Sequence, residues 1–414
     1  MSLLTLDVQL PRNASGNLPQ LLNGSANDVI SWNLLYSDPQ SSYFRIELLG
    51  HTRAADVESR ILEGCPQARV KIKDDSAAPE ALLHTTPRSL DFRRAFHRTS
   101  PEFVEDAAGS IGSRADARKL TGIENRALLL SDGSMFQVRQ KALLGMERDA
   151  YLICKFTEHE ALPLLLETRN EEEFIRNSLA LAGNASVVRL SMLQRHMAAA
   201  VVDRMQEQLE CPLIHAEQVE SASILAAIVR NAGHFHQTEL GGKNVGLIGL
   251  SPAMCGLAEL LRRMGAVKVY GIDTDYSVAS RFEREGGIAT SLDFALERCD
   301  FLIIAPQTPV LIDSKRLKEG QIVLSFTAST LDTASQEKQP ERYHYCQEPH
   351  PIYAAPGLMA SVFRYGIDSV GAEAALRLAE VLIERCGDNR FLPLPSEALI
   401  QAQVQALAPL GKSR

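Results

Sequence analysis

The sequence has few of the features that mark membrane proteins, secreted proteins or nucleic-acid-binding proteins. No apolar run approaches the roughly 20 residues that a membrane-spanning helix needs, and the first residues lack the charged and apolar regions of a signal peptide. Acidic residues outnumber basic ones, 51 to 43, and no basic stripe is present that would neutralise nucleic-acid phosphates. We therefore expect a cytoplasmic protein that binds neither membranes nor nucleic acids.

Cysteine is also sparse and scattered. The cysteines are odd in number, and they form no Cys-x-x-Cys pair and no Cys/His spacing of the kind that holds zinc. The seven are Cys65, Cys154, Cys211, Cys255, Cys299, Cys346 and Cys386. The sequence thus predicts neither a disulfide framework nor a zinc site.

What is present is the composition of an ordinary globular protein. Hydrophobic residues make up 45% of the 414 residues and charged residues 23%. A chain of this length can build two or three domains, each with its own core. No internal repeat and no low-complexity tract interrupts it.

The most informative stretch runs from Gly242 to Asp275. It predicts a strand at Asn244–Gly249, a tight turn, a helix from Pro252 to about Arg263, and a second strand at Lys268–Ile272. This is the pattern of the first βαβ unit of a dinucleotide-binding sheet. We therefore expect an α/β fold with a doubly wound Rossmann domain.

The phosphate-binding fingerprint of that unit is altered. Counting from Gly249, the second and third glycine positions hold Ser251 and Met254, which gives G-x-S-x-x-M. The Ser251 hydroxyl can still bond a phosphate, and Pro252 suits the first turn of a helix whose N-terminus, with Ala253, faces the anion. A Rossmann-shaped domain that no longer binds a cofactor remains an open alternative.

Asp273 follows the second strand, where a carboxylate would take a ribose 2′-hydroxyl and repel a 2′-phosphate. If a nucleotide binds, we expect NAD in preference to NADP. Ala305 and Pro306, at the end of a later strand, are further candidates for contacting it.

The first part of the chain alternates strand and helix signals in the order βαββαβ. The strands fall at 3–10, 29–36, 43–49 and 68–73, and the helices at 18–22 and 53–62. This order resembles an ACT domain, which we place at residues 1–76. The resemblance leaves open whether it binds an amino acid or serves only in dimerisation. The polar, proline-containing residues 77–90 are typical of a linker.

Strands and helices alternate through the rest of the chain, which favours parallel sheets. We expect strands at 127–130, 150–156, 162–166, 213–215, 301–305 and 322–326, and helices at 171–182, 191–209, 221–233, 278–284, 293–299 and 358–386.

Several of these segments, in order and with near-matching spacing, resemble the bacterial malic enzymes. They are ENRALLLSDGSMF, AYLICKF, ALPLLLET, CPLIHAEQVESASILAAIVRNA, CDFLIIAPQTPVL, GQIVLSFTAST and HPIYAAPGLMASV. The resemblance implies an α/β N-terminal catalytic-type domain at 91–233 and a Rossmann NAD-binding domain with C-terminal helices at 234–414. It also implies a homodimer, and an ancestral oxidative decarboxylation of malate with NAD(P) and a divalent metal.

The residues that the family uses for that chemistry are replaced here. The lysine of its E-G-K-A pattern falls on Asp149, and its tyrosine falls on Phe96 or Thr99. The acidic pair of its L-E-D pattern falls on Val188 and Arg189. Glu217 alone stands for the H-D-D-Q ligands, so we expect no divalent metal.

The substrate-binding positions differ as well. Thr327 and His350 take the places of asparagines, and Ala360 takes the place of an arginine. Together with Arg139 and Arg189, Thr327 and His350 are candidates for a pocket that binds a small anionic ligand. Lys155, at the end of the strand expected at 150–156, is a candidate displaced base. Glu217 is a second catalytic candidate, for which a hydrogen-bonding role is favoured, and His215 is expected to pack structurally.

Three kinds of function follow. The first is an NAD-binding oxidoreductase homologue that does not perform metal-dependent malate decarboxylation. The second is a non-catalytic protein, a pseudoenzyme, that senses a small molecule or binds a partner. The third is a structural subunit of a heteromer. If the residue correspondences are wrong, the chain is instead a functional NAD-dependent malic enzyme.

Overall fold

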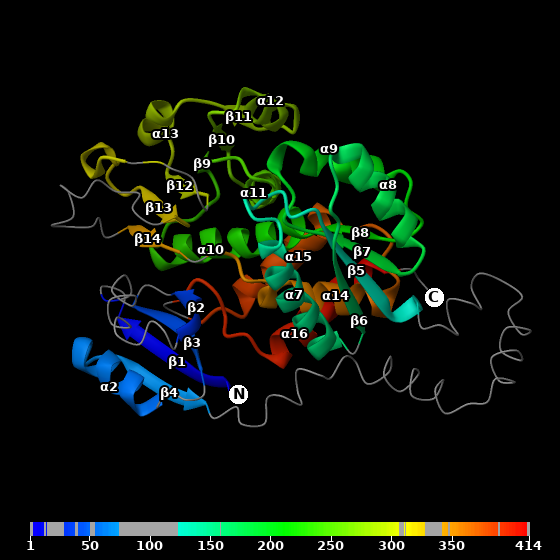
Figure 1. Ribbon diagram of the computed structural model, residues 1–414. Coiled ribbons are helices and arrows are strands. Elements are labelled where there is room, and N and C mark those ends of the chain that lie inside the picture. The colour runs from blue at the N-terminus through cyan, green and yellow to red at the C-terminus, as the bar shows by residue number, and fades with distance from the viewer. Residues whose placement is uncertain are drawn as a thin grey trace, which may run out of the picture.

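The computed structural model describes residues 3–11, 14, 29–37, 40–49, 54–73, 123–157, 159–305, 310, 312–327, 342–346, 348–387 and 390–411. Five predictions concern residues outside this part of the chain: the helix at 18–22, the linker at 77–90, Phe96, Thr99 and Pro306. Three sheets organise the described residues (Figure 1). Among the described helices, none has the length and apolar character needed to cross a membrane.

The first sheet is antiparallel and has its own core. It contains β1 (Leu3–Pro11), β2 (Val29–Ser37), β3 (Ser41–Leu49) and β4 (Arg69–Lys73), in the order β2-β3-β1-β4. Helix α2 (Ala54–Gly64) joins β3 to β4. Alternate residues of β1, namely Leu6, Val8 and Leu10, are buried with Val57 and Ile61 of α2. The strand order is that of a split βαβ arrangement.

The second sheet is parallel and has four strands. They are β5 (Arg126–Ser131), β6 (Glu160–Leu165), β7 (Val187–Leu190) and β8 (Leu213–His215), in the order β6-β5-β7-β8. Because successive side chains of a strand point to opposite faces, Val188 and Leu190 enter the core beneath α8 (Glu171–Ala182) and α9 (Arg195–Gln206). Val187 enters the core on the other face.

That other face is covered by α7 (Lys141–Thr157), where a strand at 150–156 was predicted. The prediction was wrong. The buried side chains Ala142, Met146, Ala150 and Ile153 recur every three or four residues, which is the period of a helix. The short apolar run from Tyr151 to Ile153 looks like a strand when it is read without the residues before it.

The third sheet is the expected Rossmann sheet. All six strands are parallel and their order is β11-β10-β9-β12-β13-β14, the doubly wound order 3-2-1-4-5-6. They are β9 (Asn244–Ile248), β10 (Lys268–Ile272), β11 (Ile288–Ala289), β12 (Phe301–Ile304), β13 (Ile322–Ser325) and β14 (Tyr343–Tyr345). The fold class predicted from the sequence is therefore confirmed, although β11 and β14 were not foreseen.

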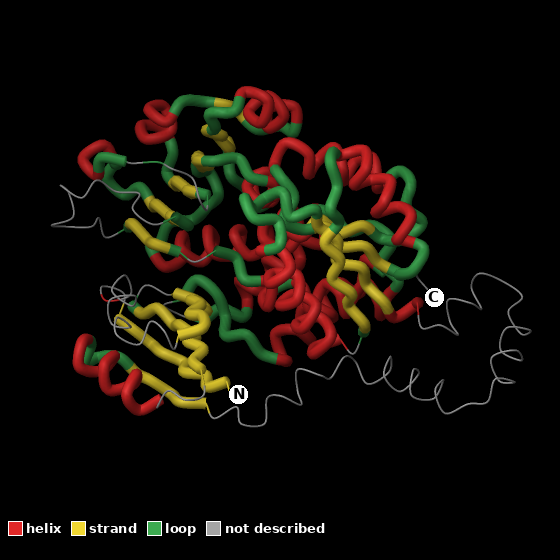
Figure 2. Tube along the Cα trace, viewed as in Figure 1, coloured by secondary structure: helices red, strands yellow, loops and turns green. Residues whose placement is uncertain are grey.

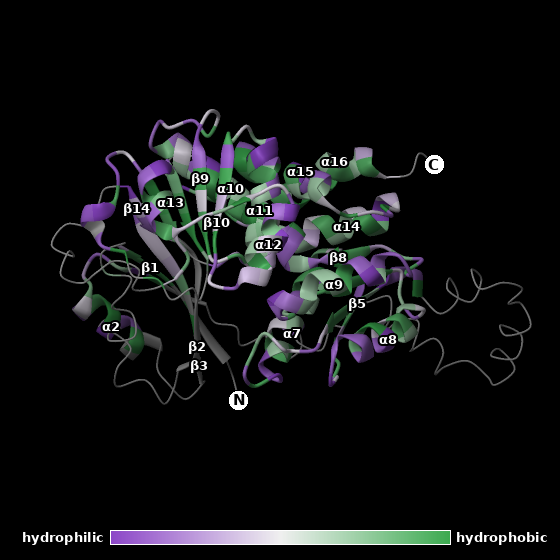
Figure 3. Cartoon of the chain, turned by 90° about the horizontal axis from the view of Figure 1, so that it is seen from above, coloured by the Kyte–Doolittle hydropathy of each residue, from purple (hydrophilic) through white to green (hydrophobic). Residues whose placement is uncertain are grey.

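Helices cover both faces of this sheet. On one face Val245 and Leu247 of β9 share a core with α10 (Ala222–Phe235) and α11 (Pro252–Arg263). On the other face Ile248 packs with residues of α13 (Leu292–Arg298). Helix α12 (Tyr276–Arg284) follows β10. Figure 2 shows strands and helices alternating along the chain, and Figure 3 shows that α10 is largely hydrophobic.

The long helical pattern predicted at 358–386 is two helices, α14 (Ala355–Tyr365) and α15 (Ala372–Glu384). Gly366 ends the first at φ +60°, a left-handed conformation that glycine adopts without steric cost. A further helix, α16 (Glu397–Leu407), was not predicted, and it packs against both α14 and α15.

Candidate functional site

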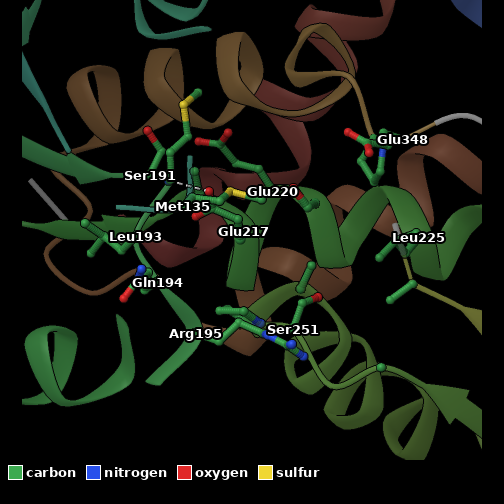
Figure 4. A pocket seen from close by; sticks show the side chains of 18 of the residues that line it. Met135, Ser191, Leu193, Gln194, Arg195, Glu217, Glu220, Leu225, Ser251 and Glu348 are labelled. Carbon is green, nitrogen blue, oxygen red and sulfur yellow. Dashed lines mark hydrogen bonds between the residues drawn. The ribbon is translucent and has the colours of Figure 1, made fainter. Parts of the chain in front are cut away.

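A cavity of about 760 Å³ lies where the carboxyl ends of the two parallel sheets face each other. Ligands of open α/β sheets bind at this edge, next to the point where the strand order reverses. Residues that follow six different strands line the cavity: Ser134, Ser191, Ala216, Gly249, Asp273 and Ala305. Figure 4 shows side chains from both halves converging on it.

The Rossmann turn forms one wall of the cavity. Gly249 has φ +84°, which lets the chain turn directly after β9. Ser251 is the N-cap of α11, its hydroxyl accepting the Met254 N–H at 3.4 Å, and Pro252 begins the helix. All three line the cavity, with Ala253 beside them. A helix N-terminus therefore faces the cavity, as anion binding requires.

Gly256 performs the packing role of the missing fingerprint glycine. A Cβ atom at this position would lie 2.3 Å from the Gln218 carbonyl oxygen and 2.9 Å from the Ala222 Cβ. Helix α11 can therefore approach the segment before α10 only because residue 256 has no side chain.

Asp273 is held by three N–H donors. Its Oδ2 accepts from Leu250 N at 2.7 Å and from Arg195 Nη1 at 2.9 Å, and its Oδ1 accepts from Asp275 N at 2.9 Å. The Asp273 side chain is only 4% exposed, whereas that of Arg195 is 50% exposed. Arg195 belongs to α9, so the ion pair joins the two sides of the cavity.

At the opposite end, a buried ion cluster forms the cavity wall. Arg189 lies on the same face of β7 as Val187, beneath α7, and is 1% exposed. Its Nε and Nη2 donate to Glu220 Oε1 at 2.8 Å and Oε2 at 2.7 Å, and its Nη1 lies 3.0 Å from Asp149 Oδ2. Arg148 Nη2 donates to the other Asp149 oxygen at 2.9 Å. Burial alone would lower the pKa of Arg189, but the carboxylates of Glu220 and Asp149 raise it above its ordinary value.

A π-helical turn, η3 (Glu217–Ser221), places two acids of this region. Glu217 and Glu220 project from it toward the cavity (Figure 4). Such turns widen a helix locally and are frequent at functional sites. Glu217 Oε1 accepts the Met192 N–H at 2.6 Å, which holds Met192 at φ +57°. Glu217 thus has the hydrogen-bonding contact that was favoured for it.

The second Glu217 oxygen faces His215. His215 Nδ1 accepts the Gln218 N–H at 3.2 Å, so the ring proton resides on Nε2, which lies 3.6 Å from Glu217 Oε2. Neither Nε2 nor Oε2 has a hydrogen-bond partner among the described residues. Burial lowers the pKa of His215, and the ring is therefore neutral near pH 7.

The structure separates the predicted site residues into two groups. Gly249, Ser251, Pro252, Ala253, Asp273, Ala305, Arg189 and Glu217 line the cavity. Lys155, Arg139, Thr327 and His350 are not among the residues that line it. Lys155 is exposed on the last turn of α7, with its Nζ 5.5 Å from the centre of the Tyr151 ring. The prediction that it ends a buried strand is therefore wrong.

The other three residues make contacts elsewhere. Arg139 Nη1 donates to the Thr168 carbonyl at 2.8 Å, the carbonyl of Thr327 accepts from the Ser325 hydroxyl, and His350 Nδ1 accepts the Ile352 N–H. Arg189 does line the cavity, but two carboxylates already neutralise the charge predicted to attract an anion. Glu220, Arg148 and Arg195 were not predicted. Glu220 and Arg195 each pair with a residue on another element, and Arg148 pairs with its neighbour Asp149, whose own role depends on Arg189.

No family model matches this chain. The NAD-dependent malic enzyme 1 of Bacillus subtilis is 27% identical to it over 220 residues, 50% of this chain and 48% of that protein. The NAD-dependent malic enzyme of Geobacillus stearothermophilus is 27% identical over 169 residues, 38% of this chain and 34% of that protein. The matches thus span about half or less of the length of these curated relatives.

The structural similarity is more extensive. The crystal structure of the NAD-dependent malic enzyme from Thermotoga maritima aligns with a TM-score of 0.64 and 19% identity, covering 86% of this chain and 99% of that one. The chain therefore has the fold of the malic enzymes, and half of it is similar in sequence to one of the NAD-dependent malic enzymes.

Proposed function

We propose that this protein is a malic-enzyme homologue that binds NAD in the cavity and does not carry out metal-dependent decarboxylation of malate. The proposal rests on one observation, the buried ion cluster of Asp149, Arg189 and Glu220. By the resemblance, Asp149 stands where the family has its lysine and Arg189 where it has a metal-binding carboxylate. Both charges are reversed, and the two residues pair with each other.

This donor set does not fit a divalent metal. Mg²⁺ and Mn²⁺ need several free carboxylate or carbonyl oxygens. Here the guanidinium of Arg189 occupies both Glu220 oxygens and one Asp149 oxygen, and Arg148 takes the other. Among the described residues no group of three metal-ligating side chains gathers. A cation entering this wall would have to displace a buried arginine.

The other end of the cavity suits an adenine dinucleotide. Ile272, Leu292 and Val310, which pack against the same core of the Rossmann sheet, supply apolar wall. Asp273 and the turn residues Gly249, Ser251, Pro252 and Ala253 line the same cavity. The Ser251 hydroxyl, which accepts from Met254 N, keeps its proton free to donate to a phosphate oxygen. The volume of the cavity, about 760 Å³, lies in the range of cofactor sites.

The same site supports an oxidoreductase reaction on a small hydroxy acid. Bound NAD would supply the hydride acceptor. Glu217 lines the cavity, and its carboxylate would take the proton of the substrate hydroxyl while the carbon–hydrogen bond transfers its electron pair as hydride. Lys141 and Arg148, which also line the cavity, would hold the substrate carboxylate.

Calorimetric titration of the purified protein tests the proposal. NAD should bind in the micromolar to millimolar range with and without Mg²⁺. Ser251→Asp keeps the N-cap but adds a negative charge at the phosphate position, so it should abolish binding. Ser396→Asp, the same change at the N-cap of α16, is the matched control and should leave binding unchanged. Malate turnover that depends on Mn²⁺ would refute the metal-free assignment.

A non-catalytic sensor is the second candidate. It is favoured by the ion pairs of Asp149 with Arg148 and of Glu220 with Arg189, which leave these cavity acids no free role in proton transfer. NAD binding without NAD reduction by any hydroxy acid of a test panel would select it. We further propose that the protein is a homodimer and is located in the cytoplasm. Sedimentation equilibrium of the purified chain tests the dimer.

A further inference from the structure

Arg195 and Asp273 meet across the cavity at the place where a dinucleotide would present its adenosine ribose. Arg195 opens α9, on the side of the four-stranded sheet, and Asp273 follows β10 of the Rossmann sheet. Arg195 Nη1 donates to Asp273 Oδ2 at 2.9 Å, and both residues line the cavity.

The position of Arg195 is locally unfavourable. The N-terminus of a helix carries a partial positive charge, so a cation in the first turn of α9 opposes the helix dipole. The N-cap residue Gln194 makes no side-chain capping bond that would offset this effect. The contact with Asp273 is thus what stabilises an arginine here.

Asp273 without a partner would repel a 2′-phosphate, which is how such carboxylates select NAD. In this structure the guanidinium neutralises that carboxylate. Three of the about four lone-pair sites of the carboxylate are occupied, which leaves one for a ribose hydroxyl. Arg195 has five N–H donors, one of them used on Asp273, and its side chain is half exposed.

We propose that Arg195 is the residue that sets nucleotide discrimination, and that it lets the site accept the 2′-phosphorylated dinucleotide NADP alongside NAD. An arginine fork next to the ribose position binds a phosphate through charge-assisted hydrogen bonds. The inference rests on the proposed function, because it requires a dinucleotide in the cavity.

The test compares three proteins by calorimetric titration with NAD and NADP. Arg195→Met removes the charge and keeps most of the apolar stem. The matched control is Arg281→Met on α12, which removes another cation that joins the same two halves, 3.6 Å from Asp203 of α9, but is not among the residues that line the cavity.

The unaltered protein should bind NADP within about tenfold of NAD. Arg195→Met should weaken NADP at least about tenfold and NAD by less than about threefold, because a lost charge-assisted bond costs about that much. Arg281→Met should leave the ratio of the two affinities unchanged. The difference in NADP affinity between the unaltered protein and Arg195→Met should also become smaller at high salt. Salt screens the contact between the phosphate and Arg195, which only the unaltered protein can make.

Two results would overturn the inference while leaving the proposed function intact. One is an equal loss of affinity for NAD and NADP in Arg195→Met, which would make Arg195 only a contact between the two halves. The other is rejection of NADP by the unaltered protein by more than about a hundredfold, as an unpaired Asp273 would predict. Binding of neither nucleotide would refute the proposed function and this inference together.

Discussion

Arg189 and Glu220 form a two-point ion pair inside the protein, with Nε–Oε1 and Nη2–Oε2 distances of 2.8 and 2.7 Å, although 31 residues separate them in the chain. Asp149 completes the cluster from a third element, α7. Because all three residues are 2% exposed or less, water cannot replace a missing partner.

Replacing Arg189 should therefore strongly destabilise the fold. Arg189→Met leaves two buried carboxylates facing each other, which costs about 3–5 kcal/mol of unfolding free energy. Urea denaturation of both proteins measures the difference. Arg204→Met is the control, because Arg204 pairs with Glu171 and Glu172 at the surface, so its replacement should change the unfolding free energy far less. Equal effects of the two changes would contradict the buried cluster.

His215 should make stability sensitive to acid. Its folded-state pKa is lowered from 6.5 by burial, so below about pH 6.5 the unfolded chain takes up a proton that the folded chain refuses. Stability should then fall with decreasing pH by up to about 1.4 kcal/mol per pH unit for this group. His215→Gln, which keeps an acceptor for Gln218 N, should flatten the profile between pH 5 and 8. An unchanged slope would exclude His215 as the source.

Gly256 should tolerate no side chain. In Gly256→Ala the new methyl group meets the Gln218 carbonyl at 2.3 Å, and backbone must move to relieve the clash. We expect a net loss of about 1–3 kcal/mol, even though alanine favours the helix. Gly241→Ala is the control, since nothing lies within 4 Å of a Cβ there. A Gly256→Ala protein as stable as the control would show that α11 is not seated this tightly.

Glu217→Gln should separate proton transfer from folding. The amide oxygen can still accept the Met192 N–H, so the unfolding free energy should change by only about 1 kcal/mol. If Glu217 is the proton acceptor, reduction of NAD by the hydroxy acid substrate should slow about a hundredfold or more. Absorbance at the reduced nicotinamide band follows the rate. Glu239→Gln, an exposed glutamate, should change neither quantity.

The Rossmann unit was predictable because its signals are local. The strand, the turn at Gly249 and the capped helix beginning at Pro252 lie within one short stretch, and the structure has each of them there. The strand predicted at 150–156 failed because a few apolar residues in a row fit a buried strand as well as one turn of helix. The helical period of α7, with a buried residue every three or four positions, is visible only when Ala142 and Met146 are considered together with Ala150 and Ile153.

The charged contacts of the site were not predictable. Arg189 was identified as a departure from the malic enzymes, but nothing in the sequence near it points to Glu220 as its partner. In the same way Asp273 was found from its position after β10, whereas Arg195, 78 residues earlier, comes from a different sheet. Such pairs depend on how two sheets are brought together, which local patterns do not encode.

The core on one face of both parallel sheets is continuous. Side chains from β5 and α7 belong to the same buried cluster as those from β9, α11 and α15, with α10 buried among them. Neither sheet can lose its packing without exposing this shared surface, so the two sheets and the helices that share this core should unfold cooperatively, as one thermodynamic unit. The sheet of β1–β4 has a separate core and is free to melt at its own temperature.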